Sequence, residues 1–210
     1  DGRLELVRKF PNNIKVFIDY AHTPDALSKV LQSLEHNYGK NKISLVFGCG
    51  GDRDKKKRTL MAKVANNYSK KIYVTDDNPR NEDPKKIRNE ILKNINLNKC
   101  FNIGNRVKAI KKAILNSEQN EVVLIAGKGH EDKQIYKNKI IYTSDKKIVK
   151  KLKLNIKTLP KKMENYLQNK SILKKIKKNI NISNFDGLAL DSRMVKKDNL
   201  FLTIKGKNSN

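Results

Sequence analysis

Between residues 14 and 150 the chain alternates short apolar runs with amphipathic stretches, and this alternation limits its possible folds more than any other feature. The apolar runs have the length of buried strands, and they lie at 14–18, 43–47, 72–75, 100–103 and 122–126. Apolar residues in the stretches between them recur at spacings of three and four, which indicates helices, at 26–34, 60–65, 84–95 and 107–114. We therefore predict an α/β fold with a doubly wound, mostly parallel sheet.

The end of this region has a different pattern. Residues 135–136 and 140–142 are typical of a short hairpin, and a last helix is expected over 148–152. The four polar or glycine-rich loops that follow predicted strands are 19–24, 48–54, 76–80 and 127–131. Because parallel strands present their carboxyl ends at one edge of the sheet, where ligands bind in open α/β folds, these loops predict a single site.

Side chains in these loops suit a zwitterionic ligand. The guanidinium forks of Arg53 and Arg80 can each bind a carboxylate or a phosphate. Pro79 stiffens its loop, and Asn78 supplies both a donor and an acceptor. The carboxylate of Glu131 can hold an ammonium group, so the set together favours an amino acid. Taken alone, the loop at 50–54 is equally well explained as a turn with a surface ion pair, and the loop at 77–80 as an ordinary Asn-Pro turn with a solvated arginine.

The remaining polar residues of the loops specify no reaction by themselves. Asp19 can accept hydrogen bonds from ribose hydroxyls, whereas His22 and His130 are interpreted first as structural loop histidines. Cys49 lies in a glycine loop where a small side chain is expected, and Cys100 has no partner at a metal-ligand spacing. Two cysteines form no disulfide framework, so a reduced cytoplasm is the expected setting, with no metal site.

The net charge of +26 suggests a polyanion partner at first sight. However, 39 of the 47 basic residues are lysines, and phosphate recognition relies more on arginine forks. We therefore expect a solvated surface and no nucleic-acid partner. The alternative is a non-enzymatic polyanion-binding module that uses the Lys-rich segment 151–182. No apolar run approaches the roughly 20 residues of a membrane span.

Four motifs together resemble, in order and spacing, the C-terminal domain of the Mur ligases. They are Asp19–Leu27, Phe47–Asp54, Thr75–Arg80 and Ala126–Asp132, and the resemblance covers roughly residues 1–152. It implies a Rossmann-like, amino-acid-binding domain of an ATP-dependent ligase in cytoplasmic peptidoglycan biosynthesis, and hence a role in cell shape and division. The motifs are most similar to those of the members that add meso-diaminopimelate to UDP-N-acetylmuramoyl-L-alanyl-D-glutamate through an acyl phosphate.

The resemblance also implies roles for individual residues. The amino-acid-binding set it implies is Arg53, Asp77, Asn78, Pro79, Arg80, Gly127 and Glu131. In that set, Arg53 and Arg80 would hold the distal carboxylate of meso-diaminopimelate and Glu131 its distal amino group. Arg80 argues against lysine as the substrate. The nucleotide-contacting residues it implies are Arg3, Asp19 and His22. ATP and Mg²⁺ themselves would be bound mainly by a central domain.

The tail has a second resemblance. Residues 153–182 predict a Lys-rich linker helix, and residues 183–210 resemble the start of an N-terminal Mur ligase domain, in which Leu190 and Ser192 would contact the UDP-sugar. The central ATPase domain and any nucleotide P-loop pattern are missing. We therefore expect a fragment of two fused ligases, with no catalytic residue of its own and no ligase activity alone.

Overall fold

The structure is a computed structural model that describes residues 4–152, 187–189 and 199–201. The chain divides into two compact units, residues 1–160 and 161–210. Strands β9 (Gly187–Ala189) and β10 (Asn199–Phe201) of the second unit pair in parallel. The predicted linker helix at 153–182 lies outside the described residues, as does most of the partial domain at 183–210. That organisation, the boundary at 152 and the polyanion alternative remain predictions.

The first unit is built on a six-stranded sheet in the order β1-β2-β6-β3-β4-β5. Its strands are β1 (Glu5–Phe10), β2 (Ile14–Asp19), β3 (Ile43–Phe47), β4 (Lys71–Val74), β5 (Cys100–Asn102) and β6 (Val122–Ala126). Every neighbouring pair is parallel except β1 and β2. The predicted α/β fold with a mostly parallel sheet is therefore confirmed.

Strand β1 is the one strand of this sheet that the apolar pattern did not predict. It is an edge strand with charged side chains at Glu5, Arg8 and Lys9, so it has no apolar run. The short 3-10 turn Pro11–Asn13 joins it directly to β2 in an antiparallel pair. Its place in the sheet depends on this pairing, which a search for buried strands does not detect.

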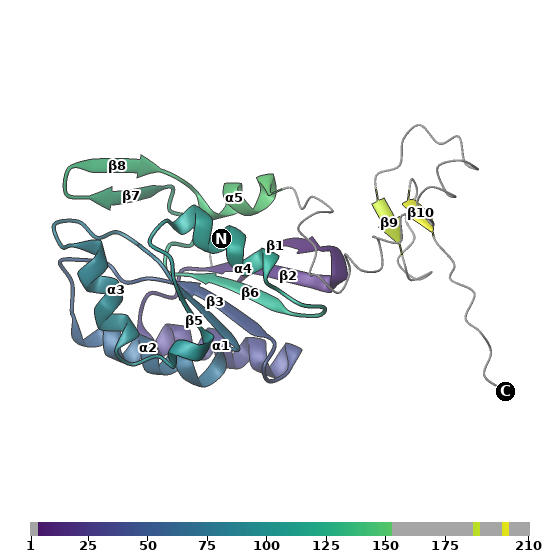
Figure 1. Ribbon diagram of the computed structural model, residues 1–210, viewed down its shortest axis with the longest axis horizontal. Coiled ribbons are helices and arrows are strands. Elements are labelled where there is room, and N and C mark those ends of the chain that lie inside the picture. The colour runs from purple at the N-terminus through teal and green to yellow at the C-terminus, as the bar shows by residue number, and fades with distance from the viewer. Residues whose placement is uncertain (1–3, 153–186, 190–198, 202–210) are drawn as a thin grey trace. The chain divides into compact units, whose positions relative to one another are not determined.

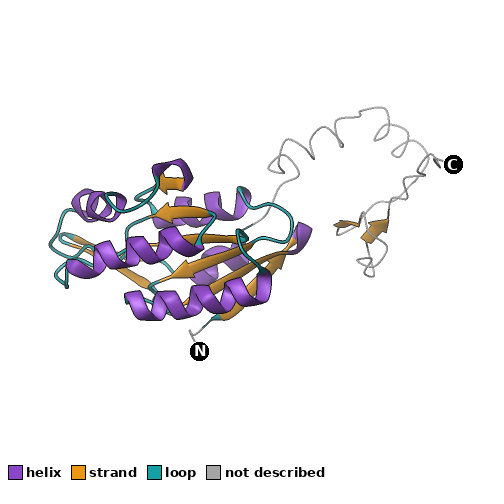
Figure 2. Cartoon of the chain, turned by 90° about the horizontal axis from the view of Figure 1, so that it is seen from below, coloured by secondary structure: helices purple, strands orange, loops and turns teal. Residues whose placement is uncertain are grey.

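Five helices cover the two faces of the sheet (Figure 1). They are α1 (Pro24–Tyr38), α2 (Lys56–Tyr68), α3 (Pro84–Leu92), α4 (Arg106–Leu115) and α5 (Asp145–Lys151). The apolar faces of α1, α2 and α3 pack in one core cluster, and those of α4 and α5 pack in the other. Figure 2 shows helices crossing in front of the strands when the domain is seen from below. Helix α3 ends three residues before the predicted end at Ile95, although Ile95 still packs in the core.

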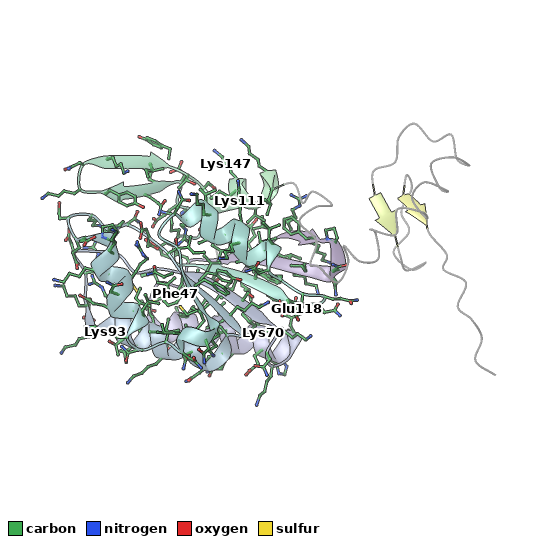
Figure 3. The ribbon with its side chains drawn as sticks, viewed as in Figure 1. Phe47, Lys70, Lys93, Lys111, Glu118 and Lys147 are labelled. Atoms are coloured by element: carbon green, nitrogen blue, oxygen red, sulfur yellow. The ribbon has the colours of Figure 1, made fainter. Side chains whose placement is uncertain are left out.

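The core follows the two-residue period of the strands. In β3, the side chain of Phe47 belongs to one cluster and that of Val46 to the other, and Val74 and Tyr73 divide in the same way in β4. Figure 3 places Phe47 in the middle of the domain and the labelled lysines at its periphery. In the described part of the chain, no helix is long and apolar enough to cross a membrane.

The predicted hairpin is present as β7 (Lys133–Tyr136) and β8 (Lys139–Tyr142), which pair with each other and not with the main sheet. It follows the loop that leaves β6, and it extends beside α5 in Figure 1. Its backbone meets the loop after β4 at a bridge between Arg80 and Tyr136. The hairpin is therefore part of the framework of the candidate site.

Candidate functional site

The four predicted loops lie at one edge of the sheet. Strands β2, β6, β3 and β4 are neighbours and run in parallel, so the loops that leave them emerge on the same side. The amide of Gly127 donates a hydrogen bond to the backbone oxygen of Asp19 at 3.1 Å, which joins the first and last of these loops. The topology thus brings together segments that are more than 100 residues apart in the sequence.

The loops after β3 and β4 are in direct contact at Gly51. Its amide donates to the backbone oxygen of Asn78 at 2.9 Å, and its own carbonyl accepts from Nη1 of Arg80 at 2.9 Å. A Cβ atom on Gly51 would lie 1.9 Å from the carbonyl oxygen of Pro79. The close approach of the two backbones therefore requires glycine at this position.

Replacing Gly51 by alanine should separate these two loops, because a backbone oxygen cannot move aside as a flexible side chain can. We expect an unfolding free energy lower by about 2–3 kcal/mol, in the range of other overpacked buried sites, and loss of ligand binding at the loops. Gly39→Ala is the matched control, since its φ of +92° is strained but no atom lies within 4 Å of the new Cβ. Gly39→Ala should lower stability only. Equal binding by both variants would contradict the requirement for glycine.

Asn78 connects three segments of the site. Its Nδ2 donates to Oε2 of Glu131 at 3.1 Å, and its Oδ1 accepts from the amide of Ile135 at 3.0 Å. The amide of Arg80 donates to the carbonyl of the same Ile135 at 2.9 Å, and Arg80 has a left-handed φ of +51°. The first strand of the hairpin therefore holds the side chain of Asn78 and the backbone of Arg80.

Two residues of β7 contribute to the site although no sequence motif indicated them. The buried side chain of Gln134 donates to the backbone oxygens of Asp76 and Asp77 at 3.0 and 2.9 Å. The hydroxyl of Tyr136 donates to Oδ2 of Asp76 at 3.0 Å. These contacts span about 60 residues of sequence, so only the folded hairpin shows them.

The side chains of both predicted arginines lie close to Gly50. A Cβ atom on Gly50 would be 2.8 Å from Nη1 of Arg80 and 3.9 Å from Cγ of Arg53. Arg53 is exposed, and its Nη1 donates to the neighbouring backbone oxygen of Asp52 at 3.2 Å. The structure thus brings Arg53, Asn78, Arg80 and Glu131 together at one edge.

Asp77 is buried against Gly127. A Cβ atom on Gly127, whose φ is +110°, would lie 2.8 Å from Oδ2 of Asp77. Burial raises the pKa of the Asp77 carboxyl, and the charges of Arg106 and Lys128 act in the opposite direction. The structure therefore places the side chain of Asp77 against the backbone of Gly127. Pro79, in the same loop as Asp77, packs its carbonyl group against Gly51.

A buried ion pair that the sequence did not reveal holds the loop after β4 to α2. Arg58, which is almost fully buried, donates to Glu82 at 2.8 and 3.0 Å and to Glu90 at 2.7 Å. Glu82 also accepts from the amide of Asp52 at 2.7 Å. The hydrogen bonds and charge of Arg58 lower the pKa of Glu82 to about 2.

This pair makes stability depend on pH in a defined window. A carboxyl with a depressed folded pKa stabilises the fold above its unfolded pKa, and it loses that contribution as the pH falls through its folded pKa. Glu82→Gln should lower the unfolding free energy by about 1.5–3 kcal/mol at neutral pH, the range for hydrogen bonds to charged groups. The difference should shrink between pH 4.5 and about 2. Urea unfolding of both proteins across this range measures it, and a constant difference would contradict the pairing.

Two of the predicted nucleotide-contacting residues, Asp19 and His22, lie at the end of β2 and in the loop that follows it. Asp19 is only 5% exposed, and its carboxylate accepts from the amides of Ala21, at 2.7 Å, and Leu4. His22 is exposed, with Nδ1 2.9 Å from the backbone oxygen of Tyr20. The ring of Tyr20 lies 4.7 Å from that of His22 and 6.2 Å from that of His130. Arg3, Leu190 and Ser192 lie outside the described residues.

Neither cysteine forms a disulfide or belongs to a possible metal site among the described residues. Burial raises the pKa of the Cys49 thiol to about 12, and its Sγ lies 3.8 Å from the sulfur of Met61. Both cysteines are free. Among the described residues, no group of three or more His, Cys, Asp or Glu could hold a metal ion.

The order of these loops and their geometry agree with one known family. The sequence model described as "Mur ligase, glutamate ligase domain" matches residues 2–129. The chain therefore belongs to the Mur ligase family, of which it contains the C-terminal domain, and the resemblance of the four motifs is confirmed.

Within the Mur ligase family, the chain is similar to several ligases that carry the same name. The chain is 48% identical over 151 residues to the UDP-N-acetylmuramoyl-L-alanyl-D-glutamate--2,6-diaminopimelate ligase of Rickettsia montanensis, covering 71% of this chain and 31% of the relative. It is 49% identical over 155 residues to the enzyme of that name from Wigglesworthia glossinidia brevipalpis, covering 72% and 30%. A solved structure of a ligase with the same name superposes with a TM-score of 0.65 at 37% identity, covering 71% of this chain and 31% of that one. The chain thus spans about a third of the length of these relatives.

Proposed function

We propose that this chain provides the amino-acid-binding part of an ATP-dependent ligase that adds meso-diaminopimelate to UDP-N-acetylmuramoyl-L-alanyl-D-glutamate in peptidoglycan biosynthesis. The observation that supports this most is that Asn78 and Arg80, on the loop after β4, come together with Glu131, on the loop after β6, and that Arg53, on the loop after β3, lies beside them. The names of the relatives supply the substrate class. Because the chain spans only part of those relatives, the complete reaction is part of the proposal.

The distal end of meso-diaminopimelate carries one carboxylate and one ammonium group, and the charges at the site match both. Nη1 of Arg80 donates to Gly51 and Asn78, and no described residue accepts a hydrogen bond from its Nη2. That donor and the exposed guanidinium of Arg53 are proposed to bind the carboxylate. Glu131, whose side chain is 36% exposed, is proposed to bind the ammonium group.

Lysine lacks the distal carboxylate, so its binding would leave both guanidinium groups without that partner. A site built to pair with a polar group rejects an analogue that lacks the group, because its own polar groups then stay unpaired. The proposed site therefore distinguishes meso-diaminopimelate from lysine mainly through Arg53 and Arg80.

The loop after β2 is proposed to face the nucleotide. ATP supplies the phosphoryl group that activates the carboxylate of the acceptor, and we propose that ATP and Mg²⁺ are held mainly by residues beyond this sequence. Asp19 keeps acceptor capacity beside the two amides it binds, since a carboxylate has about four lone-pair sites. Asp19, exposed His22 and Arg3 are proposed to face the nucleotide. This chain's own task is to present the amino group of the incoming amino acid.

The proposal extends to the organisation of the chain and its setting. We propose a binding domain over residues 1–152, a basic linker over 153–182 and the start of a second ligase over 183–210, with Leu190 and Ser192 facing a UDP-sugar. The proposed setting is the cytoplasm, where the nucleotide substrates are made. No catalytic residue is assigned within this chain.

A domain exchange tests the proposed function. Residues 1–152 would replace the matching segment of the Wigglesworthia ligase, and product would be measured with ATP, Mg²⁺, the UDP-linked acceptor and either meso-diaminopimelate or lysine. The exchanged enzyme should make product with meso-diaminopimelate only, and the present chain alone should make none. A folded exchanged enzyme that uses lysine equally well, or that uses neither amino acid, would contradict the proposal.

A further inference from the structure

Lys128 is a fully buried lysine in the loop that follows β6. It lies between Gly127 and Gly129, which both have positive φ values, of +110° and +54°. Burying an ammonium group is costly unless it is paired and hydrogen-bonded. A lysine in such a position therefore requires specific partners, and its partners belong to the candidate site.

The partners of Lys128 are Glu131 and the start of the hairpin. Its Nζ donates to Oε2 of Glu131 at 3.3 Å and to the backbone oxygen of Lys133, the first residue of β7. Nδ2 of Asn78 donates to the same Oε2 at 3.1 Å. No described residue donates to Oε1 of Glu131. One carboxylate oxygen is thus held from two sides while the other stays available.

We propose that Lys128 is a positioning residue for recognition of the ligand's distal ammonium group. By fixing Oε2 together with Asn78, it holds the Glu131 carboxylate in one rotamer with Oε1 toward the ligand. Without this contact the carboxylate would have to be ordered by the ligand itself, at a cost in side-chain entropy. Its second hydrogen bond ties the same loop to β7, which orients Asn78 through Ile135. This inference rests on the proposed function.

Comparing the affinities for two ligands distinguishes a positioning role of Lys128 from a general structural role. Meso-diaminopimelate has two amino groups, whereas 2-aminopimelate keeps both carboxylates and has hydrogen in place of one amino group. The quantity to measure is the ratio of their dissociation constants for the full chain. The wild-type chain should prefer meso-diaminopimelate, and Lys128→Met should reduce that preference about tenfold, as for loss of a hydrogen bond to a charged group. Affinity for 2-aminopimelate should stay within about twofold, because the hydrogen bonds of Lys128 go to Glu131 and Lys133 and not to Arg53 or Arg80.

A double-mutant cycle shows whether Lys128 acts through Glu131. Glu131→Gln should itself remove the preference, and adding Lys128→Met to that variant should change the ratio no further. Lys99→Met is the matched control. Lys99 comes just before strand β5, away from the loops of the candidate site, and its ammonium group donates to the backbone oxygens of Asn66 and Ser69. It should leave the ratio unchanged. If Lys128→Met does not fold, Lys128→Gln, which keeps a neutral donor, should give a smaller loss of preference.

The outcomes distinguish this inference from the proposed function. If the wild-type chain binds meso-diaminopimelate and prefers it, the proposed function stands whatever the Lys128 variants do. Equal weakening of both ligands by Lys128→Met, or an unchanged ratio, would then overturn the positioning role alone. A wild-type chain that binds neither ligand, or that shows no preference between them, would overturn the assignment of Glu131 and this inference with it.

Discussion

Replacing Arg80 by alanine is expected to weaken binding of meso-diaminopimelate by about 2–4 kcal/mol, or roughly 30- to 1,000-fold, as for truncation of one partner of a desolvated charge pair. Two effects add. The ligand's distal carboxylate loses one of its two proposed guanidinium partners, and the loops lose the hydrogen bonds from Nη1 to the carbonyls of Gly51 and Asn78. Calorimetric titration of the purified variant measures the loss.

Two further variants separate charge from geometry in this prediction. Arg80→Lys keeps the positive charge but not the planar fork, so it should recover only part of the affinity. Lys93→Ala removes one exposed charge after the end of α3 (Figure 3) and should leave binding unchanged. A fall in affinity of the same size for Lys93→Ala and Arg80→Ala would show that net charge, not Arg80, governs binding.

The largest effect on stability is expected at the buried pair of Arg106 and Asp145. Both side chains are completely buried, and the guanidinium donates to the carboxylate at 2.7 and 2.9 Å. Nη2 of Arg106 also donates to the backbone oxygen of Ala126 at 3.1 Å, so the pair joins the first turns of α4 and α5 to the end of β6. Asp145→Ala would leave an unpaired buried charge, so we expect the unfolding free energy to fall by about 3–5 kcal/mol.

The double variant Arg106→Met/Asp145→Leu tests the reason for that loss. It removes both charges and keeps apolar volume, so it should be clearly more stable than Asp145→Ala, because a buried pair and a well-packed apolar pair are often similar in stability. Urea unfolding of the three proteins gives the comparison. A loss of less than about 1 kcal/mol in Asp145→Ala would contradict the view that the pair is desolvated and essential.

Much of the fold could be predicted because each interior strand is an apolar run that is buried on both faces. The run at residues 122–126 is an example: Leu124 packs in one core cluster and Ile125 in the other. The same pattern also predicted that the loops after these strands would meet at one edge of the sheet, because the carboxyl ends of neighbouring parallel strands lie there. Strand β1 escaped prediction because it is a charged edge strand whose pairing, not its composition, determines its structure.

The parts of the site that could not be predicted are contacts between distant segments. Arg53, Arg80 and Glu131 were predicted because each lies in a loop after a strand. The side chain of Gln134 donates hydrogen bonds to backbone oxygens that are 57 and 58 residues away, and nothing in its own sequence neighbourhood indicates these contacts. The pairing of Arg58 with Glu82 likewise depends on how α2 and the loop after β4 meet in space.

The loops after β3, β4 and β6 are proposed to form a binding site for meso-diaminopimelate. A two-dimensional NMR titration of the chain with meso-diaminopimelate, and then with lysine, tests this site most directly. The amide signals of Arg53, Asn78, Arg80 and Gly127–Glu131 should shift with meso-diaminopimelate and stay unchanged with lysine. No shift at saturating meso-diaminopimelate, or the same shifts with lysine, would contradict the claim.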